Sequence, residues 1–402
     1  MGYEKERQIQ QWEQGWTFSD KDICYLCLSE PVLKEFVRDH ADRVQCDFCD
    51  RKHRKNAAVE FNSVMEVIGD AIRQYYSIAS DTLSYDREDE TYMGSTYDTR
   101  DVLDDLGWPS NNDSVIEEIV ECLGHETWCD RHPYSLSGVE RYDSSWEQFC
   151  KTVKHKVRYF FGDVEEEKYS ETIPVPEMLG TIEELTERAD MIVTLDQGES
   201  FYRVRHHPKG QSCSTWRELG APPPERAMAS RMSAAGISVF SAGLDMMTAR
   251  AETTFRARRG WIFTGARWRS TRPLRILDLT RTPSIPSVYA TPRYDRYDLV
   301  FLLHFVQSVS QPVIPDDRVH IEYVPTQIVT EFFRHSRSNG DLSIDGIIYP
   351  SAQRKGRSIV IFVSQEDLNP TPFIRLRDDV PLLTLDTSPI QRVRKYRQRQ
   401  TN

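Results

Sequence analysis

The sequence lacks several features that would assign it to a familiar class. No stretch approaches the roughly 18 to 20 continuous apolar residues that span a bilayer, and residues 1–16 have no apolar signal-peptide core. Neither GxGxxG nor GxxxxGK[ST] occurs, so no Rossmann dinucleotide site or P-loop is predicted. We therefore expect a cytoplasmic protein without a membrane partner, in which side chains hold any nucleotide.

An excess of positive charge is also missing. The 402 residues carry a formal net charge of −11, which argues against a protein that coats nucleic acid nonspecifically. The composition is that of a globular protein, and the length favours two domains over a single core. We expect a small molecule or a protein as partner, and a homo-oligomer stays open.

Cysteine is scarce, but half of it is concentrated in two CxxC pairs. Of eight cysteines, Cys24 and Cys27 form one pair and Cys46 and Cys49 the other, with 18 residues between the pairs. This spacing is typical of a tetrahedral Zn²⁺ site with no open position for water. We predict a structural zinc knuckle over about residues 20–55; the alternative is four buried thiols.

A second group of metal-type residues follows at Cys122, His125, Cys129 and His132. Their spacing does not suit one tetrahedral ion if the segment is helical. We interpret them as ordinary packed or solvated side chains.

The first 162 residues indicate a mostly helical domain. Apolar residues recur at intervals of three and four over 61–76, and a further helix is predicted near 115–123. Another is predicted to open with Ser144 and Glu147 in capping-box spacing. Residues 163–197 are then predicted to be an acidic, proline-containing linker and a helix.

Residues 198–385 alternate between short apolar strands and helices, which predicts an α+β domain. Helices are expected over 245–255, with Asp245 as cap, and over 297–309 and 326–336. Residues 386–402 form a basic tail. The predicted strands are FYRVR from 201, ISVFSA from 237, WIFTGA from 261, LRILDL from 274, HIEYV from 320, GIIYPS from 346 and SIVIFV from 358.

Three arginines in this domain are candidates for binding phosphate. Arg203 and Arg205 alternate with apolar residues in FYRVR, and Arg231 lies in a turn rich in Gly, Ser and Ala. The planar fork of a guanidinium matches phosphate oxygens. Taken singly, each is more typical of an ordinary salt-bridge partner.

A glutamate and a serine complete a candidate site. Glu252 has the small neighbours Ala249 and Ala251, so its carboxylate could face a cleft and stabilise the positive charge that develops when an N-glycosidic bond breaks. Ser351 follows Pro350 at the end of a predicted strand, where ligand contacts are common. Taken alone, a glutamate such as Glu252 is typical of a solvated helix face, and a serine such as Ser351 is typical of a turn.

The segments FYRVR, SRMSAAGISVFSAGLDMMTARAE, EYVPTQIVTEF and GIIYPSAQRKGRSIVIF resemble the RES domain in order and spacing, over about residues 198–365. The resemblance implies a fold related to ADP-ribosyltransferases. It also implies an NAD⁺-degrading activity that releases nicotinamide by phosphorolysis or hydrolysis. Characterised members of the family are toxins of bacterial toxin–antitoxin pairs.

Carried onto this chain, the resemblance implies that Arg203, Glu252 and Ser351 are the catalytic residues. Arg231 matches a second arginine of the family. With it we expect four further residues to bind the dinucleotide: Arg205, Phe240, Ser241 and Tyr349.

One position departs from the family. Where a tyrosine is common, as in a FYGA-like run, this chain has Ser241 after Phe240. The missing ring removes a surface on which nicotinamide or ribose could stack. The departure puts the rate of the reaction in question.

The N-terminal part resembles the HEPN-like domain that accompanies some RES domains, in its CxxC pairs and in DSSWEQFCKTVKHKVRYFF from residue 143. Active HEPN ribonucleases use an arginine followed four to six residues later by a histidine. No histidine of residues 1–162 stands at that spacing. We expect a regulatory or structural domain.

Three functions are compatible with these observations. The first is an NAD⁺ phosphorylase or glycohydrolase acting as a toxin of a toxin–antitoxin or anti-phage defence system, with NAD⁺ and inorganic phosphate as small-molecule partners and an antitoxin or inhibitory protein as restraint. The second is an ADP-ribosyltransferase that modifies a macromolecule. The third is a catalytically weakened nucleotide-sensing or interaction protein.

Overall fold

The structure is a computed structural model that divides into two compact units. Unit 1 comprises residues 1–137 and 285–296, and unit 2 comprises residues 138–284 and 297–402, so the chain passes between the units three times. No helix within the described ranges is long and apolar enough to cross a membrane. The described residues are 9, 11, 13–49, 51–163, 171–211, 213–254, 261–282, 284–290, 296–311, 319–335, 343–368, 381–386 and 392–393.

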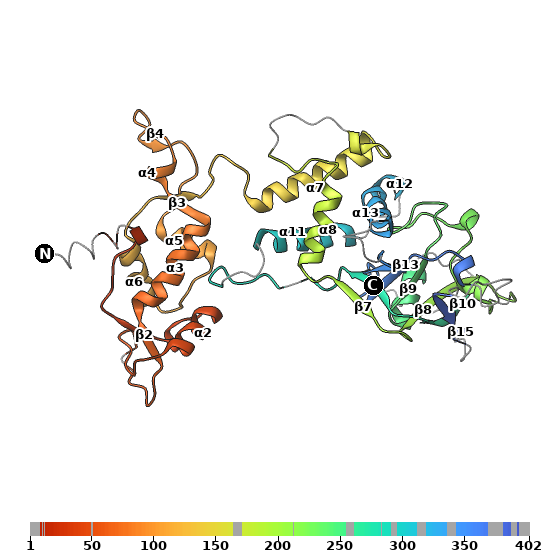
Figure 1. Ribbon diagram of the computed structural model, residues 1–402, viewed down its shortest axis with the longest axis horizontal. Helices are drawn as coiled ribbons and strands as arrows, with labels where there is room; N and C mark the ends of the chain where they lie inside the picture. The colour runs from red at the N-terminus through yellow and green to blue at the C-terminus, as the bar shows by residue number, and fades with distance from the viewer. Residues whose placement is uncertain are drawn as a thin grey trace, which may run out of the picture. The chain divides into compact units, whose positions relative to one another are not determined.

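Unit 1 is mainly helical and is built around one amphipathic helix (Figure 1). In α3 (Phe61–Tyr75), the residues Val64, Met65 and Ile68 are fully buried, as their helical spacing predicts. The predicted helix near 115–123 is also confirmed, as α6. The elements of unit 1 are β1 (Asp22–Cys24), η1 (Tyr25–Cys27), α2 (Pro31–His40), β2 (Ala58–Glu60), α3, β3 (Tyr76–Ile78), α4 (Ala79–Thr82), β4 (Tyr85–Asp86), β5 (Thr91–Tyr92), α5 (Thr99–Leu106), α6 (Asp113–Leu123) and β6 (Trp128–Asp130).

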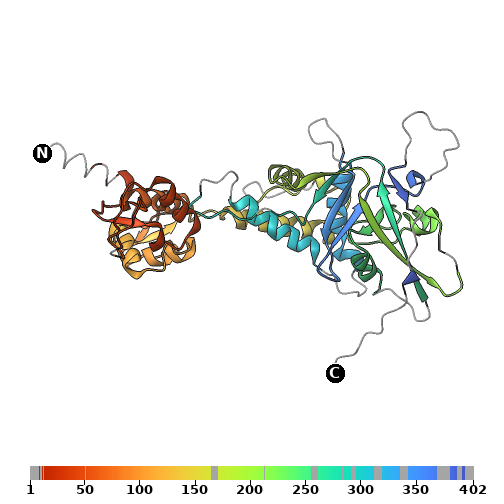
Figure 2. The ribbon, with the colours of Figure 1, turned by 90° about the horizontal axis from the view of Figure 1, so that it is seen from below.

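Unit 2 contains a nine-stranded mixed sheet in the order β14-β10-β8-β9-β13-β12-β11-β7, with β15 also paired to β10 (Figure 2). Only β11 and β12 pair in parallel among the described strands. The strands are β7 (Ile192–Leu195), β8 (Ser200–Pro208), β9 (Phe240–Gly243), β10 (Trp261–Ser270), β11 (Leu274–Asp278), β12 (Gly346–Pro350), β13 (Arg357–Ile361), β14 (Leu383–Leu385) and β15 (Arg392–Val393).

The two faces of this sheet bury different sets of side chains. Phe201, Phe240 and Trp268 belong to one apolar cluster. Val204 is three residues after Phe201 on β8 and so lies on the opposite face, where it belongs to another cluster with Ala249 of α10 (Met246–Thr254). The other helical elements of unit 2 are α7 (Gly138–His155), η2 (Phe161–Asp163), α8 (Met178–Arg188), α9 (Trp216–Leu219), η3 (Pro224–Arg226), α11 (Arg296–Ser310), α12 (Val319–Glu322), α13 (Val324–His335) and η5 (Glu366–Leu368).

Helix α7 belongs to unit 2, although the predicted domain boundary stands at residue 162. Its Tyr142 ring stacks on Phe301 with centroids 5.0 Å apart, and Trp146 packs edge-on against Phe305 at 5.1 Å. The prediction that this helix opens at Ser144 is wrong, because it begins at Gly138. Contacts of Tyr142 with α11 stabilise the first turns of α7. The capping-box pattern is local and could not indicate these contacts.

The strand predicted for HIEYV is also wrong. Residues 319–322 form α12, and α13 follows from Val324. The polar residues of EYVPTQIVTEFF therefore lie on helices, with Val324, Val329 and Phe333 buried. A short apolar run is compatible with both the helical and the strand periodicity, and tertiary packing decides which of the two forms. In the predicted basic tail, Arg392 and Val393 pair with β10, and the rest beyond Asp386 lies outside the described residues.

Candidate active site and metal centre

Arg203 is positioned by strand β8. The single registered pair between β8 and β9 joins Tyr202 to Gly243, so Arg203 follows the point where these strands meet. Its Nη1 donates to the carbonyl oxygen of Ser241, and its guanidinium lies 5.2 Å from the centroid of the Phe240 ring. Burial, reinforced by Arg205, lowers the pKa of Arg203. Arg203 is therefore a poorly solvated cation.

Arg205 lies on the same face of β8 as Arg203 but is engaged elsewhere. Its Nη2 donates to the carbonyl oxygen of Gly220 over 2.9 Å. Burial lowers the pKa of Arg205 as well. The predicted binding residue thus lies next to Arg203 on the strand, with one of its donors committed to the backbone.

Arg231 reaches the site from the loop before β9. Its Nη1 donates to the carbonyl oxygen of Ser310 over 3.1 Å, and its guanidinium lies 5.9 Å from the centroid of the Tyr349 ring. Thr326 holds the backbone of Arg231 by donating from Oγ1 to its carbonyl oxygen over 2.8 Å. The end of α11 and the start of α13 thus fix this arginine.

The three arginines share one unusual feature. The Nε atoms of Arg203, Arg205 and Arg231 are all buried and make no hydrogen bond to any described residue. Buried donors are normally paired. Three buried N–H groups without acceptors are suited to a ligand that carries anionic oxygens.

Glu252 and Ser351 meet directly. Ser351 Oγ donates to Glu252 Oε1 over 2.5 Å, and the buried Ser358 hydroxyl on β13 lies 3.4 Å from the same oxygen. Among the described residues, Oε2 of Glu252 accepts no hydrogen bond. Two hydroxyls therefore orient the carboxylate and leave its second oxygen available.

Helix α10 carries Glu252 to this position from a well-formed N-terminus. Asp245 accepts from Thr248 N over 2.8 Å and from Thr248 Oγ1 over 2.6 Å, so the predicted cap is confirmed. These hydrogen bonds lower the pKa of Asp245 against the opposing effect of burial. Glu252 is two turns further along the helix.

The turn that carries Ser351 is held against the same end of α10. Arg354 Nη1 lies 3.0 Å from Asp245 Oδ1, and Ser351 N donates to Gly356 O over 2.9 Å. A Cβ on Gly356 would lie 2.1 Å from Thr248 Oγ1, so only glycine allows this approach. The turn therefore presents Ser351 to Glu252 in a defined geometry.

Tyr349 is the residue that connects the two halves of the site. Burial raises the pKa of its phenol, and Glu252 raises it further, whereas Arg231 and Arg203 act in the opposite direction. Glu252, Arg203 and Arg231 are therefore all close enough to act electrostatically on this phenol, and the Arg231 guanidinium lies over its ring. Arg203 itself makes no hydrogen bond to Glu252 or Ser351 among the described residues.

The structure also places residues that the sequence analysis did not select. Ser358 adds a second hydroxyl to Glu252, and Arg354 fixes the turn. Ser358 is a polar residue at a buried position of a strand, facing Tyr349 across the ladder. That pattern was the available signal for Ser358. Conversely, the Phe240 ring is fully buried under Arg203 and against Trp268, and only the carbonyl of Ser241 contacts Arg203.

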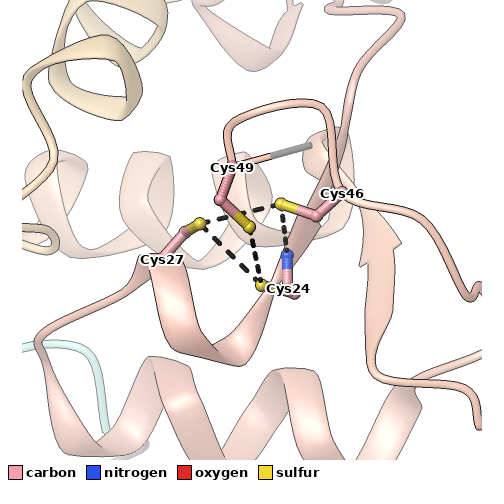
Figure 3. A group of neighbouring side chains, drawn as sticks. All are labelled: Cys24, Cys27, Cys46 and Cys49. Carbon is pink, nitrogen blue, oxygen red and sulfur yellow. Dashed lines mark hydrogen bonds between the residues drawn. The ribbon is translucent and has the colours of Figure 1, made fainter. Parts of the chain in front are cut away.

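The two CxxC pairs converge in unit 1. The Sγ atoms of Cys24, Cys27, Cys46 and Cys49 all lie within 4.8 Å of one another, and Figure 3 shows them pointing toward a common centre. The Sγ atom of Cys24 lies 3.8 Å from those of Cys27 and Cys49, and Cys27 to Cys46 is 3.7 Å. Zn–S bonds of about 2.3 Å give a tetrahedron with edges of about 3.8 Å. The donor set therefore fits a tetrahedral thiophilic metal.

The protonation of these thiols is already biased in the protein. The hydrogen bond between Cys24 and Cys46 raises the pKa of Cys24 and lowers that of Cys46 to about 4. Metal binding requires thiolates, so it releases the protons that these thiols hold. Within the described part of the chain, Cys122 and Cys129 join no metal-type cluster and lie in apolar cores.

Two parts of the chain match known domain families. Residues 200–384 match the family described as RES domain, and residues 39–167 match the family described as HEPN/RES N-terminal domain 1. Among curated proteins, no match was found.

One solved structure is similar to part of the chain. It is the M. tuberculosis MbcT-MbcA toxin-antitoxin complex, at 14% sequence identity, with 52% of this chain and 92% of that chain covered and a TM-score of 0.26. A TM-score this low carries no argument about fold or function.

Proposed function

We propose that this protein is an enzyme that splits NAD⁺ at the nicotinamide–ribose bond, because residues 200–384 match the RES domain and residues 39–167 match HEPN/RES N-terminal domain 1. The observation that carries the proposal is the hydrogen bond from Ser351 to Glu252. Nearby, Arg203 and Arg231 act electrostatically on the pKa of the Tyr349 phenol, as Glu252 does. In this proposal the carboxylate of Glu252, the guanidinium groups of Arg203 and Arg231 and the hydroxyl of Ser351 act on one dinucleotide.

In this proposal the arginines bind the pyrophosphate. Arg203 and Arg231 each offer a buried Nε without a partner among the described residues, and phosphate oxygens supply the missing acceptors. Arg205 offers a third such donor. Contacts with the non-reacting phosphates would be used to orient the glycosidic bond.

Glu252 acts on the ribose. The C1′–N1 bond breaks with its electron pair moving to the nicotinamide ring nitrogen, which becomes neutral as positive charge develops on the ribose. The Oε2 oxygen of Glu252, free among the described residues, faces this charge, and Ser351 fixes the nicotinamide ribose. An oxygen of water or phosphate then forms the new bond to C1′. With water, one proton is released; inorganic phosphate would instead yield a sugar phosphate.

The four cysteines serve a structural purpose in the same proposal. Cys24, Cys27, Cys46 and Cys49 would hold Zn²⁺ and leave no position open for water. A bound ion would cross-link the two CxxC pairs, which have 18 residues between them in the sequence. An NAD⁺-consuming toxin must also be restrained, and we propose an antitoxin protein as a partner.

Substitution of Glu252 tests the assignment. Glu252→Gln keeps an acceptor for Ser351 but removes the charge, so we expect nicotinamide release to fall about 100- to 1,000-fold. Nicotinamide is quantified by chromatography after incubation of the full chain with NAD⁺. Glu331→Gln, on helix α13 of the same unit, is the matched control and should keep wild-type turnover. Full activity in Glu252→Gln would refute the catalytic role.

A further inference from the structure

A short segment between β11 and α11 packs into unit 1. In residues 285–290, Tyr289 is 5% exposed and lies in the same apolar core as α3 and α6. Its phenol donates to the carbonyl oxygen of Gly107 over 2.9 Å, and Val288 packs against the same core. Although these residues fall within the RES match, they complete the core of the other unit. We refer to residues 285–290 as the docked segment.

The acceptor of Tyr289 belongs to a stretch that also holds the metal centre. Ser110 Oγ donates to the carbonyl oxygen of Cys27. Ser29, two residues after Cys27, donates from N to Pro109 O over 2.9 Å and from Oγ to Trp108 O over 3.2 Å. Residues 107–110, here called the bridge, thus form hydrogen bonds with Cys27 and Ser29 of the four-cysteine site on one side and with Tyr289 on the other.

The rest of the docked segment borders a cavity that is open to solvent. This cavity of about 460 Å³ is lined by the docked segment together with Pro31, Trp108 and Arg296. Arg296, the first residue of α11, donates to Pro286 O over 2.6 Å. Tyr289, which is buried in the core and hydrogen-bonded to Gly107, is therefore the anchor of the docked segment. An anchor of this kind is sensitive to small shifts of the bridge.

We propose that the bridge is a binding surface whose partner is the docked segment of the same chain, and that metal binding and docking are energetically coupled. A filled four-cysteine site fixes Cys27 and Ser29, which fixes the bridge and the acceptor of Tyr289. Linkage makes the coupling reciprocal, so undocking weakens metal binding by the same factor. This inference is independent of the proposed NAD⁺ chemistry.

Zinc affinity of a Tyr289 variant tests the coupling. The full chain is loaded with Zn²⁺ and equilibrated with a chelating dye of known affinity, for wild type, Tyr289→Ala and Tyr289→Phe. We expect Tyr289→Ala to bind Zn²⁺ about fivefold or more weakly, with Tyr289→Phe between it and wild type. Tyr159→Ala, which removes a tyrosine that is 83% exposed, should match wild type. Equal affinity for wild type and Tyr289→Ala would overturn the proposal.

A second variant separates coupling from simple unfolding. Ser29→Ala removes one hydroxyl that contacts the bridge and leaves all four cysteines in place. We expect one Zn²⁺ per chain and wild-type circular dichroism, together with faster hydrogen exchange at residues 285–290. Unchanged exchange there, in both Ser29→Ala and the zinc-free wild type, would show that the docked segment does not respond to the metal centre.

Discussion

At the scale of single residues, the environment of Glu252 is asymmetric. One carboxylate oxygen accepts a hydrogen bond from Ser351 and lies near the hydroxyl of Ser358. The other oxygen accepts no hydrogen bond from any described residue. The sequence predicted that Glu252 and Ser351 share a site because both match the RES pattern. The sequence has a serine at 358 in an apolar strand, but it does not tell which residue that serine contacts, so its proximity to Glu252 could not be predicted. The contact of Arg203 with a carbonyl also depends on where two strands meet.

The two serines should differ in their effect on turnover. Ser351→Ala removes a hydrogen bond to a charged group, worth about 1.5 to 3 kcal/mol, so we expect kcat to fall roughly 10- to 100-fold. Ser358 is 3.4 Å from the same oxygen, and a longer bond is weaker. Steady-state NAD⁺ consumption should therefore show a smaller loss for Ser358→Ala. A larger loss for Ser358→Ala would mean that Ser351 is not the principal hydroxyl.

At the scale of elements, long periodic segments were predictable and short ones were not. Helices α3, α6 and α13 were predicted from helical patterns, β8 from the alternation in FYRVR and β12 as a short apolar strand. HIEYV was wrongly predicted as a strand because five residues are too few to distinguish helical from strand periodicity. The start of α7 was wrongly placed because its first turns depend on contacts with α11. Tertiary packing therefore decided the elements that local patterns left ambiguous.

Helix α7 should be essential to the stability of unit 2. Trp146 is 6% exposed, packs against Phe149 and Phe305 and donates to Ser308 Oγ over 3.0 Å. We expect Trp146→Ala to lower the free energy of unfolding by about 3 to 5 kcal/mol, measured by urea denaturation. Tyr159→Ala, at a surface position, should stay within about 0.5 kcal/mol of wild type. Wild-type stability of Trp146→Ala would show that α7 is peripheral.

At the scale of the whole molecule, family matches and packing divide the chain differently. The HEPN/RES N-terminal match extends to residue 167, yet α7 packs in unit 2, and residues 285–296 of the RES match pack in unit 1. The sequence predicted two domains in the observed order, one mostly helical and one mixed. It could not predict this exchange of segments, because contacts such as Tyr289 with Gly107 join residues far apart in the chain. The predicted domain limits and the relation to ADP-ribosyltransferases stay predictions.

The most direct test of the account is the fate of NAD⁺ itself. The purified full chain is incubated with NAD⁺ with and without inorganic phosphate, and the products are followed by proton and phosphorus NMR. The account predicts free nicotinamide together with ADP-ribose, or with its C1′ phosphate ester if phosphate is the acceptor. Intact NAD⁺ under both conditions, from a folded protein freed of any restraining partner, would contradict it.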